Sequence, residues 1–210
     1  RDVAPSRGLG DVYKRQVLTD FLSTGTYTAK REFYKTTSPS MDILVSSNLE
    51  RLLYHVTGSD AEVAGLMKSL NETGRYTVRP ETLKAIQESF DCGWSSEEQV
   101  AGEIRARYEK DGYLCDTHTA VAFHVAAQKK RDGVPMVVLS TASPFKFPRS
   151  VLEALGHTAP ENDFEAMQAL EEATGRTAPA SLAVLRQKAE RFSTVIDPAQ
   201  IAEVALGCQA

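Results

Sequence analysis

An apolar helix followed at once by an apolar strand constrains this chain more than any other feature of its sequence. Residues 117–130 have helical spacing, and apolar side chains lie around most of the circumference, so this helix should be buried. Asp132-Gly133 then turns the chain into residues 135–139, a continuous apolar run that is typical of a central parallel strand. A buried helix next to such a strand predicts an α/β fold.

Helices dominate the rest of the predicted structure. Four amphipathic segments lie between residues 48 and 110 with no strand predicted between them, which indicates a helical layer. Three of these segments have serine at the predicted start and glutamate three residues later, the capping-box pattern, at Ser47, Ser59 and Ser95. After the predicted strand, further helices are expected at residues 149–155, 164–173 and 182–192.

Composition and charge exclude several classes of function. Of the 210 residues, 42% are hydrophobic, which suffices for a sizeable core. A net charge of −4 argues against a nucleic-acid partner, and no apolar run approaches the roughly 20 residues of a membrane helix. The three cysteines form no CxxC pair and no cluster with histidine, which favours reduced thiols in a cytoplasmic protein and predicts no metal site.

The first 16 residues differ from the remainder. They show neither strand nor helix periodicity, and they mix glycines with scattered charges. Their last six residues, DVYKRQ, look like a translated sequencing adapter joined to a truncated reading frame. We therefore expect residues 1–16 to be a non-native or disordered arm and residues 17–210 to be the folded portion.

Two polar segments are candidates for binding a ligand, because ligands of open α/β sheets gather at the carboxyl ends of strands. The loop at residues 140–147 follows the predicted strand and contains three hydroxyl side chains and Lys146. The other candidate is the start of the apolar helix, where Asp116 and His118 lie. From residue types alone, an aspartate at a helix start, such as Asp116, is most often a helix cap, and the residue type favours a structural histidine at His118.

Four blocks of the sequence, in order, resemble those of threonine synthases. They are VLTDFL at residues 17–22, SPSMDILVSSNLER at 38–51, DTHTAV at 116–121 and STASPFKF at 140–147. The resemblance implies the C-terminal part of a fold-type-II (tryptophan synthase β-like) pyridoxal-phosphate enzyme, an α/β fold that is helix-rich here and has a parallel-sheet remnant. Such enzymes convert O-phosphohomoserine and water into threonine and phosphate.

The resemblance also implies roles for particular side chains. A hydroxyl faces the cofactor's pyridine nitrogen in this family, and Thr141 matches that position, with Ser140 as the neighbouring alternative. Asp116 and His118 are implied to line the pocket behind the cofactor ring. For Lys146 two interpretations stay open: positive charge on the phosphate-handling side, or pairing with a carboxylate.

Other parts of the family's site have no counterpart in these 210 residues. The Schiff-base lysine lies far upstream in a Phe-Lys-Asp context that does not occur here, and the Gly/Asn-rich loop around the cofactor phosphate is also missing. We therefore expect no catalytic residue in the chain and no activity of the chain alone. Two alternatives remain: a threonine-synthase-like phospho-lyase, and a non-catalytic α/β fragment. A small-molecule substrate is the expected partner, and the oligomeric state is left open.

Overall fold

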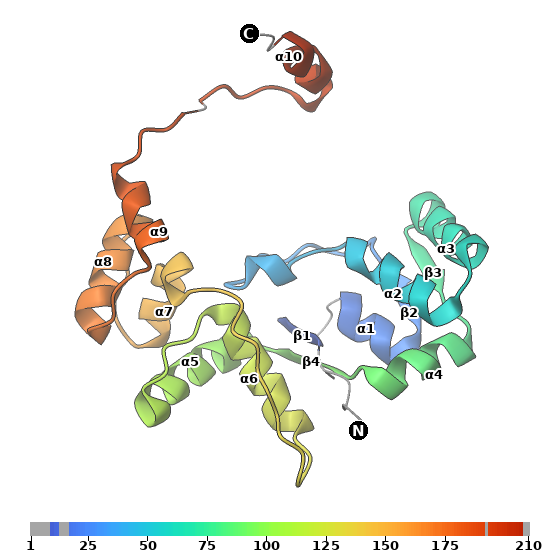
Figure 1. The fold of residues 1–210 in the computed structure, drawn as a ribbon, viewed down its shortest axis with the longest axis horizontal. Coiled ribbons are helices and arrows are strands. Elements are labelled where there is room, and N and C mark those ends of the chain that lie inside the picture. The colour runs from blue at the N-terminus through green and yellow to red at the C-terminus, as the bar shows by residue number, and fades with distance from the viewer. Residues whose placement is uncertain (1–8, 13–16, 192, 208–210) are drawn as a thin grey trace. The chain divides into compact units, whose positions relative to one another are not determined.

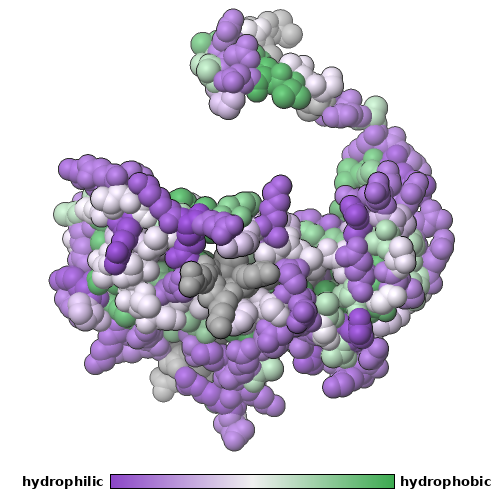
Figure 2. All heavy atoms as spheres, turned by 180° about the vertical axis from the view of Figure 1, so that it is seen from behind, coloured by the Kyte–Doolittle hydropathy of each residue, from purple (hydrophilic) through white to green (hydrophobic). Residues whose placement is uncertain are grey.

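The computed structural model describes residues 9–12, 17–191 and 193–207, which fall into two units, Arg1–Ala178 and Pro179–Ala210 (Figure 1). The second unit contains only short helices: α9 (Ala180–Ala183), η3 (Val184–Gln187), η4 (Pro198–Gln200) and α10 (Ile201–Gly207). None of its described residues is buried. Figure 2 accordingly shows apolar side chains of this unit at the surface.

The first half of the large unit is built around three aromatic rings. Its elements are α1 (Val17–Thr24), β2 (Thr26–Thr28), η1 (Pro39–Met41), α2 (Ser47–Thr57), α3 (Asp60–Thr73), β3 (Arg75–Thr77) and α4 (Pro80–Ser89). Strands β2 and β3 pair antiparallel, which stacks Tyr27 on Tyr76 at 5.1 Å between ring centroids, and Phe21 meets both rings edge-on. Gly25 joins α1 to β2 with a φ of +75°, a left-handed conformation that glycine adopts without strain.

The other half of the large unit contains the parallel strand pair, and its first strand precedes all other elements in the sequence. Its elements are β1 (Leu9–Val12), β4 (Cys92–Ser95), α5 (Glu97–Asp111), α6 (Thr117–Lys129), η2 (Pro144–Lys146), α7 (Pro148–Ala154) and α8 (Asp163–Thr174). Helix α5 packs on α6 and α7, and α7 packs on α8. A Cβ at Gly93 would lie 2.7 Å from Val125, so this glycine lets β4 lie directly against α6.

The helix-rich α/β fold with a parallel-sheet remnant is confirmed, but the remnant is not where the sequence predicts it. Strands β1 and β4 form the parallel pair. The apolar run at residues 134–139 belongs to no strand, and Val137 is 77% exposed. A strand needs a neighbouring backbone for its N–H and C=O groups, and in the described part of the chain none pairs with this run.

Strand β1 lies within the arm expected at residues 1–16, which otherwise stays a prediction. Leu9–Val12 pairs with Cys92–Ser95, so these four residues are not an unpaired arm at the level of the backbone. The rest of the expected arm, residues 1–8 and 13–16, lies outside the described residues. Periodicity missed this strand because four residues are too few to establish a repeat of two.

Two other predictions about helical segments were wrong in part. The predicted layer at residues 48–110 does hold four helices, α2 to α5, but β3 and β4 lie between them. The predicted helix at residues 182–192 is replaced by the short α9 and η3, followed by extended backbone at Lys188. A short amphipathic helix gains most of its stability from packing, and no described side chain is buried in this unit.

The helix starts moved by one residue in two of the three predicted capping boxes. Ser59 caps α3 as predicted, and its hydroxyl accepts a hydrogen bond from the Glu62 N–H. The cap of α5 is Ser96, which forms the box with Gln99, whereas Ser95 ends β4. The cap of α2 is Ser46, and its side chain makes no capping hydrogen bond.

Candidate functional site

The first turn of α6 is a buried polar cluster centred on Asp116. This carboxylate is fully buried and caps the helix by accepting hydrogen bonds from the N–H groups of His118, at 2.9 Å, and Thr119, at 3.4 Å. It also accepts one from the Thr119 hydroxyl. Burial by itself would raise the pKa of the Asp116 carboxyl, but the hydrogen bonds from His118 and Thr119 outweigh burial and hold the pKa below its ordinary value.

His118 connects this cluster to two other segments. Its Nδ1 lies 3.1 Å from Asp116 Oδ1, and its Nε2 accepts a hydrogen bond from the Ser40 N–H at 3.1 Å. Because Nε2 accepts, the ring proton of the neutral imidazole lies on Nδ1 and points at Asp116. The ring also packs on Phe147, with 4.8 Å between centroids. His118 thus links the segment that contains Ser40 to the segment that contains Phe147.

The same turn holds the 36–42 segment at a second point. The Thr117 hydroxyl donates to the Thr37 carbonyl at 2.8 Å, and the Thr37 N–H faces the Glu97 carboxylate at 3.3 and 3.4 Å. Sequence reasoning assigned no role to Thr37 or Ser40. The available signal was their position in and beside the SPSMD block, one of the four that carry the family resemblance.

The loop after residue 139 meets this cluster through Ser140. The hydroxyl oxygens of Ser140 and Thr119 are 3.5 Å apart. Thr141 is exposed. The structure therefore brings Asp116, His118 and Ser140 together, with Thr141 as the next residue along the same loop.

Lys146 lies apart from the Asp116 cluster. It ends η2, its side chain is exposed, and its Nζ lies 5.9 Å from the centre of the Phe147 ring. In the described part of the chain no ion pair joins it to a carboxylate. It lines a surface pocket together with Thr36 and Thr37.

The described residues also limit other kinds of site. They contain no group of three or more His, Cys, Asp or Glu side chains that could hold a metal ion. None of the described helices is long and apolar enough to cross a membrane. Cys92 and Cys115 are free thiols, and Cys208 lies outside the described residues.

Comparison with known proteins gives a consistent result. The family described as threonine synthase, C-terminal, matches residues 119–205. Threonine synthase-like 1 from Pongo abelii is 35% identical over 144 residues, 68% of this chain and 19% of that protein. Threonine synthase from Methylobacillus glycogenes is 36% identical over 149 residues, 69% of this chain and 31% of that protein.

Solved structures give the same result for the fold. The PLP-bound threonine synthase from Brucella melitensis superposes with a TM-score of 0.74 and 38% identity, covering 91% of this chain and 38% of that chain. The chain described here thus spans well under half the length of each of these three relatives.

Proposed function

Because this chain belongs to the threonine synthase family and corresponds to a C-terminal portion of these enzymes, we propose that it is part of a lyase that converts O-phosphohomoserine and water into threonine and phosphate. The family is one of pyridoxal-phosphate-dependent lyases. The observation that carries the proposal is the hydrogen-bonded set of Asp116, His118, Thr119 and Ser140, because Ser140 begins the loop matched to the family's cofactor position.

The donor groups of this loop fit one end of the cofactor. Pyridoxal phosphate supplies the electron sink for bonds that break next to the amino-acid α carbon. A neutral hydroxyl is a suitable donor to a neutral ring nitrogen, and the exposed Thr141, with Ser140 as the alternative, would provide it. Asp116 would act through Thr119, whose hydroxyl it holds beside Ser140.

The remaining requirements are not met within these residues. No Phe-Lys-Asp segment occurs, so no lysine matches the family's Schiff-base residue. Lys146 follows Phe145, but it lies in η2 and lines a pocket whose described lining does not include Ser140 or Thr141. The chain alone is therefore proposed to be inactive, and the proposed location of the parent enzyme is the cytoplasm.

A chimera tests this proposal. Residues 17–178 would replace the equivalent segment of the Brucella melitensis enzyme, which is 38% identical. The chimera should release threonine and phosphate from O-phosphohomoserine, and the isolated chain should release neither. A folded, cofactor-loaded chimera without any product would contradict the proposal. Phosphate release without threonine would instead support the phospho-lyase, a second candidate suggested by the similarity to threonine synthase-like 1.

The chimera also tests Thr141. Thr141→Val removes the hydroxyl at nearly constant volume, and the cofactor's ring nitrogen would then lack its hydrogen-bond donor. An unpaired buried acceptor of this kind costs about 1–3 kcal/mol. Turnover should therefore fall by about ten- to a hundredfold if the bond tightens in the transition state. Thr141→Ser should retain most of the activity. If Thr141→Val were fully active and Ser140→Ala were impaired, the two roles would be exchanged.

A further inference from the structure

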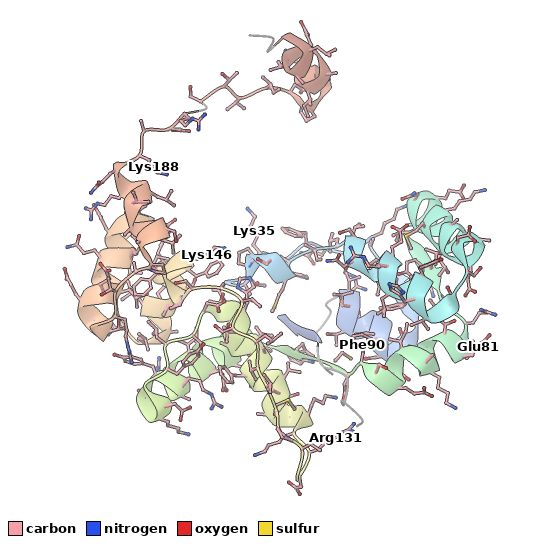
Figure 3. The ribbon with its side chains drawn as sticks, viewed as in Figure 1. Lys35, Glu81, Phe90, Arg131, Lys146 and Lys188 are labelled. Atoms are coloured by element: carbon pink, nitrogen blue, oxygen red, sulfur yellow. The ribbon has the colours of Figure 1, made fainter. Side chains whose placement is uncertain are left out.

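A surface pocket of about 360 Å³ lies between two segments that are far apart in the sequence. One side is formed by Thr36, Thr37 and Pro39, and the other by residues 146–150 together with Glu153 and Asp163. Figure 3 shows Lys146 on the segment that leads into α7, and Lys35 immediately before the first wall. The volume lies in the range of small-molecule sites.

Four charged side chains line this pocket, and they do not neutralise one another. Lys146 and Arg149 are cationic, and Glu153 and Asp163 are anionic. Arg149 and Glu153 are four residues apart, a spacing at which opposite charges on a helix commonly pair. In the described part of the chain none of the four takes part in an ion pair. Their charges are therefore available to a ligand.

The walls of the pocket are held by contacts behind them. The N–H and the hydroxyl of Thr36 each donate to the Asp42 carboxylate at 2.7 Å. His118 accepts a hydrogen bond from the Ser40 N–H, directly after the lining residue Pro39, and its ring packs on Phe147 of the other wall. A site whose backbone is already fixed loses less entropy when a ligand binds.

The balance of charges selects the kind of ligand. A simple anion would be attracted by two of the lining side chains and repelled by the other two, and the same holds for a simple cation. A molecule that carries both charges can satisfy both pairs. We propose that this pocket binds a free α-amino acid as its zwitterion, with the carboxylate toward Lys146 and Arg149 and the ammonium group toward Glu153 and Asp163.

This amino-acid site is distinct from the proposed cofactor position. Its described lining includes none of Asp116, Ser140 or Thr141. It requires neither the cofactor nor the part of the parent enzyme that this chain does not contain. Binding can therefore be measured on the 210-residue chain itself, and the result does not depend on the proposed reaction.

Amide NMR titration of the full chain with three probes tests the proposal. Glycine carries both charges, acetate only the negative one and methylammonium only the positive one. Glycine should produce saturable shifts at Thr37, Phe147 and Ser150, with a dissociation constant on the order of 1 mM. Acetate and methylammonium should bind at least about tenfold more weakly. Equal binding of acetate and glycine, or no saturation by glycine up to about 50 mM, would overturn the proposal.

Two double variants assign the charges. Lys146→Gln with Arg149→Gln should weaken glycine binding by about two- to twenty-fivefold, since each of the two exposed ionic contacts contributes up to about fivefold. Glu153→Gln with Asp163→Asn should also weaken glycine binding but should strengthen acetate binding. The control is Arg51→Gln with Lys84→Gln, which makes the same charge change on α2 and α4 and should leave glycine binding unchanged. Unchanged glycine binding in both pocket variants, with folded spectra, would contradict the assignment.

Discussion

Helix α6 and the apolar run at residues 134–139 have similar hydrophobic composition and opposite fates. Val121 of α6 is 0% exposed, whereas Val137 and Leu139 are 77% and 72% exposed. The helix forms its backbone hydrogen bonds within itself and needs only packing surfaces, which α5 and β4 supply. The run at 134–139 needs another strand, and no described strand pairs with it. Hydrophobic composition therefore indicates burial only where the partner elements are available.

The largest expected difference in stability is between two variants that introduce the same charge, one in α6 and one in the run at residues 134–139. Val121→Asp puts a carboxylate into the interface of α6 and should destabilise the chain by about 4 kcal/mol or more, enough to unfold it. Val137→Asp, at an exposed position, should change stability by no more than about 0.5 kcal/mol. Urea unfolding followed by circular dichroism measures both. Equal losses in the two variants would mean that residues 134–139 are buried in solution.

The next effect concerns the cap of α6. Asp116→Ala removes the cap and leaves the His118 and Thr119 donors unpaired, and it should cost about 3 kcal/mol at neutral pH. Because the pKa of Asp116 is lowered in the folded chain, its contribution is present above the unfolded pKa, about 3.9, and is lost as the pH falls through the folded value.

Asp116→Asn separates the charge from the hydrogen bonds. The asparagine keeps a capping oxygen but has no charge to titrate. The free energy of unfolding of this variant should therefore vary less with pH below about pH 4 than that of the parent, which has one more ionisable group. Urea unfolding at neutral pH and at about pH 3 gives the difference. Parallel pH profiles for the parent and Asp116→Asn would show that Asp116 does not ionise in this range.

A third prediction uses the chimera, in which the remainder of the Brucella melitensis enzyme could supply a partner strand for residues 134–139. If this run is a strand that lacks its partner, the amides of residues 136–139 should exchange with solvent at least about tenfold more slowly in the chimera than in the isolated chain. Amides in the middle of α6 serve as the internal reference, because that helix is already hydrogen-bonded. Equally fast exchange of residues 136–139 in both proteins would reject the strand interpretation.

The smallest expected effect tests local hydrogen bonding at the start of α5. Ser96→Ala removes the hydroxyl that accepts the hydrogen bond from the Gln99 N–H, while the Ser96 N–H that donates to the Gln99 side chain is kept, and it should cost about 1 kcal/mol. Ser95 is buried, and its hydroxyl has no partner in the described part of the chain, so Ser95→Ala should change stability by less than about 0.5 kcal/mol. Thermal unfolding of the two variants checks this pair. A larger loss for Ser95→Ala would restore the cap that the sequence predicts.

Much of the site is local in sequence and could be predicted. Asp116 caps α6 because aspartate at a helix start can accept from the next N–H groups, and His118 follows two residues later. The pairing of this turn with Ser40 and Thr37 could not be predicted, since those residues are 78 and 80 positions away in the sequence. The same holds for the pocket that joins Thr36 to Lys146.

The sequence by itself determined the helices that pack, the cap at Asp116 and, through four ordered blocks, the family. The helices and the cap depend on hydrogen bonds and side-chain spacing between residues within about one or two helical turns of each other, and this spacing can be read directly from the sequence. Tertiary structure alone decided which apolar segments are buried, which strand pairs with β4, and how His118 spaces two walls of a pocket. Those outcomes depend on partners that are distant in sequence, and a strand, unlike a helix, cannot satisfy its own backbone.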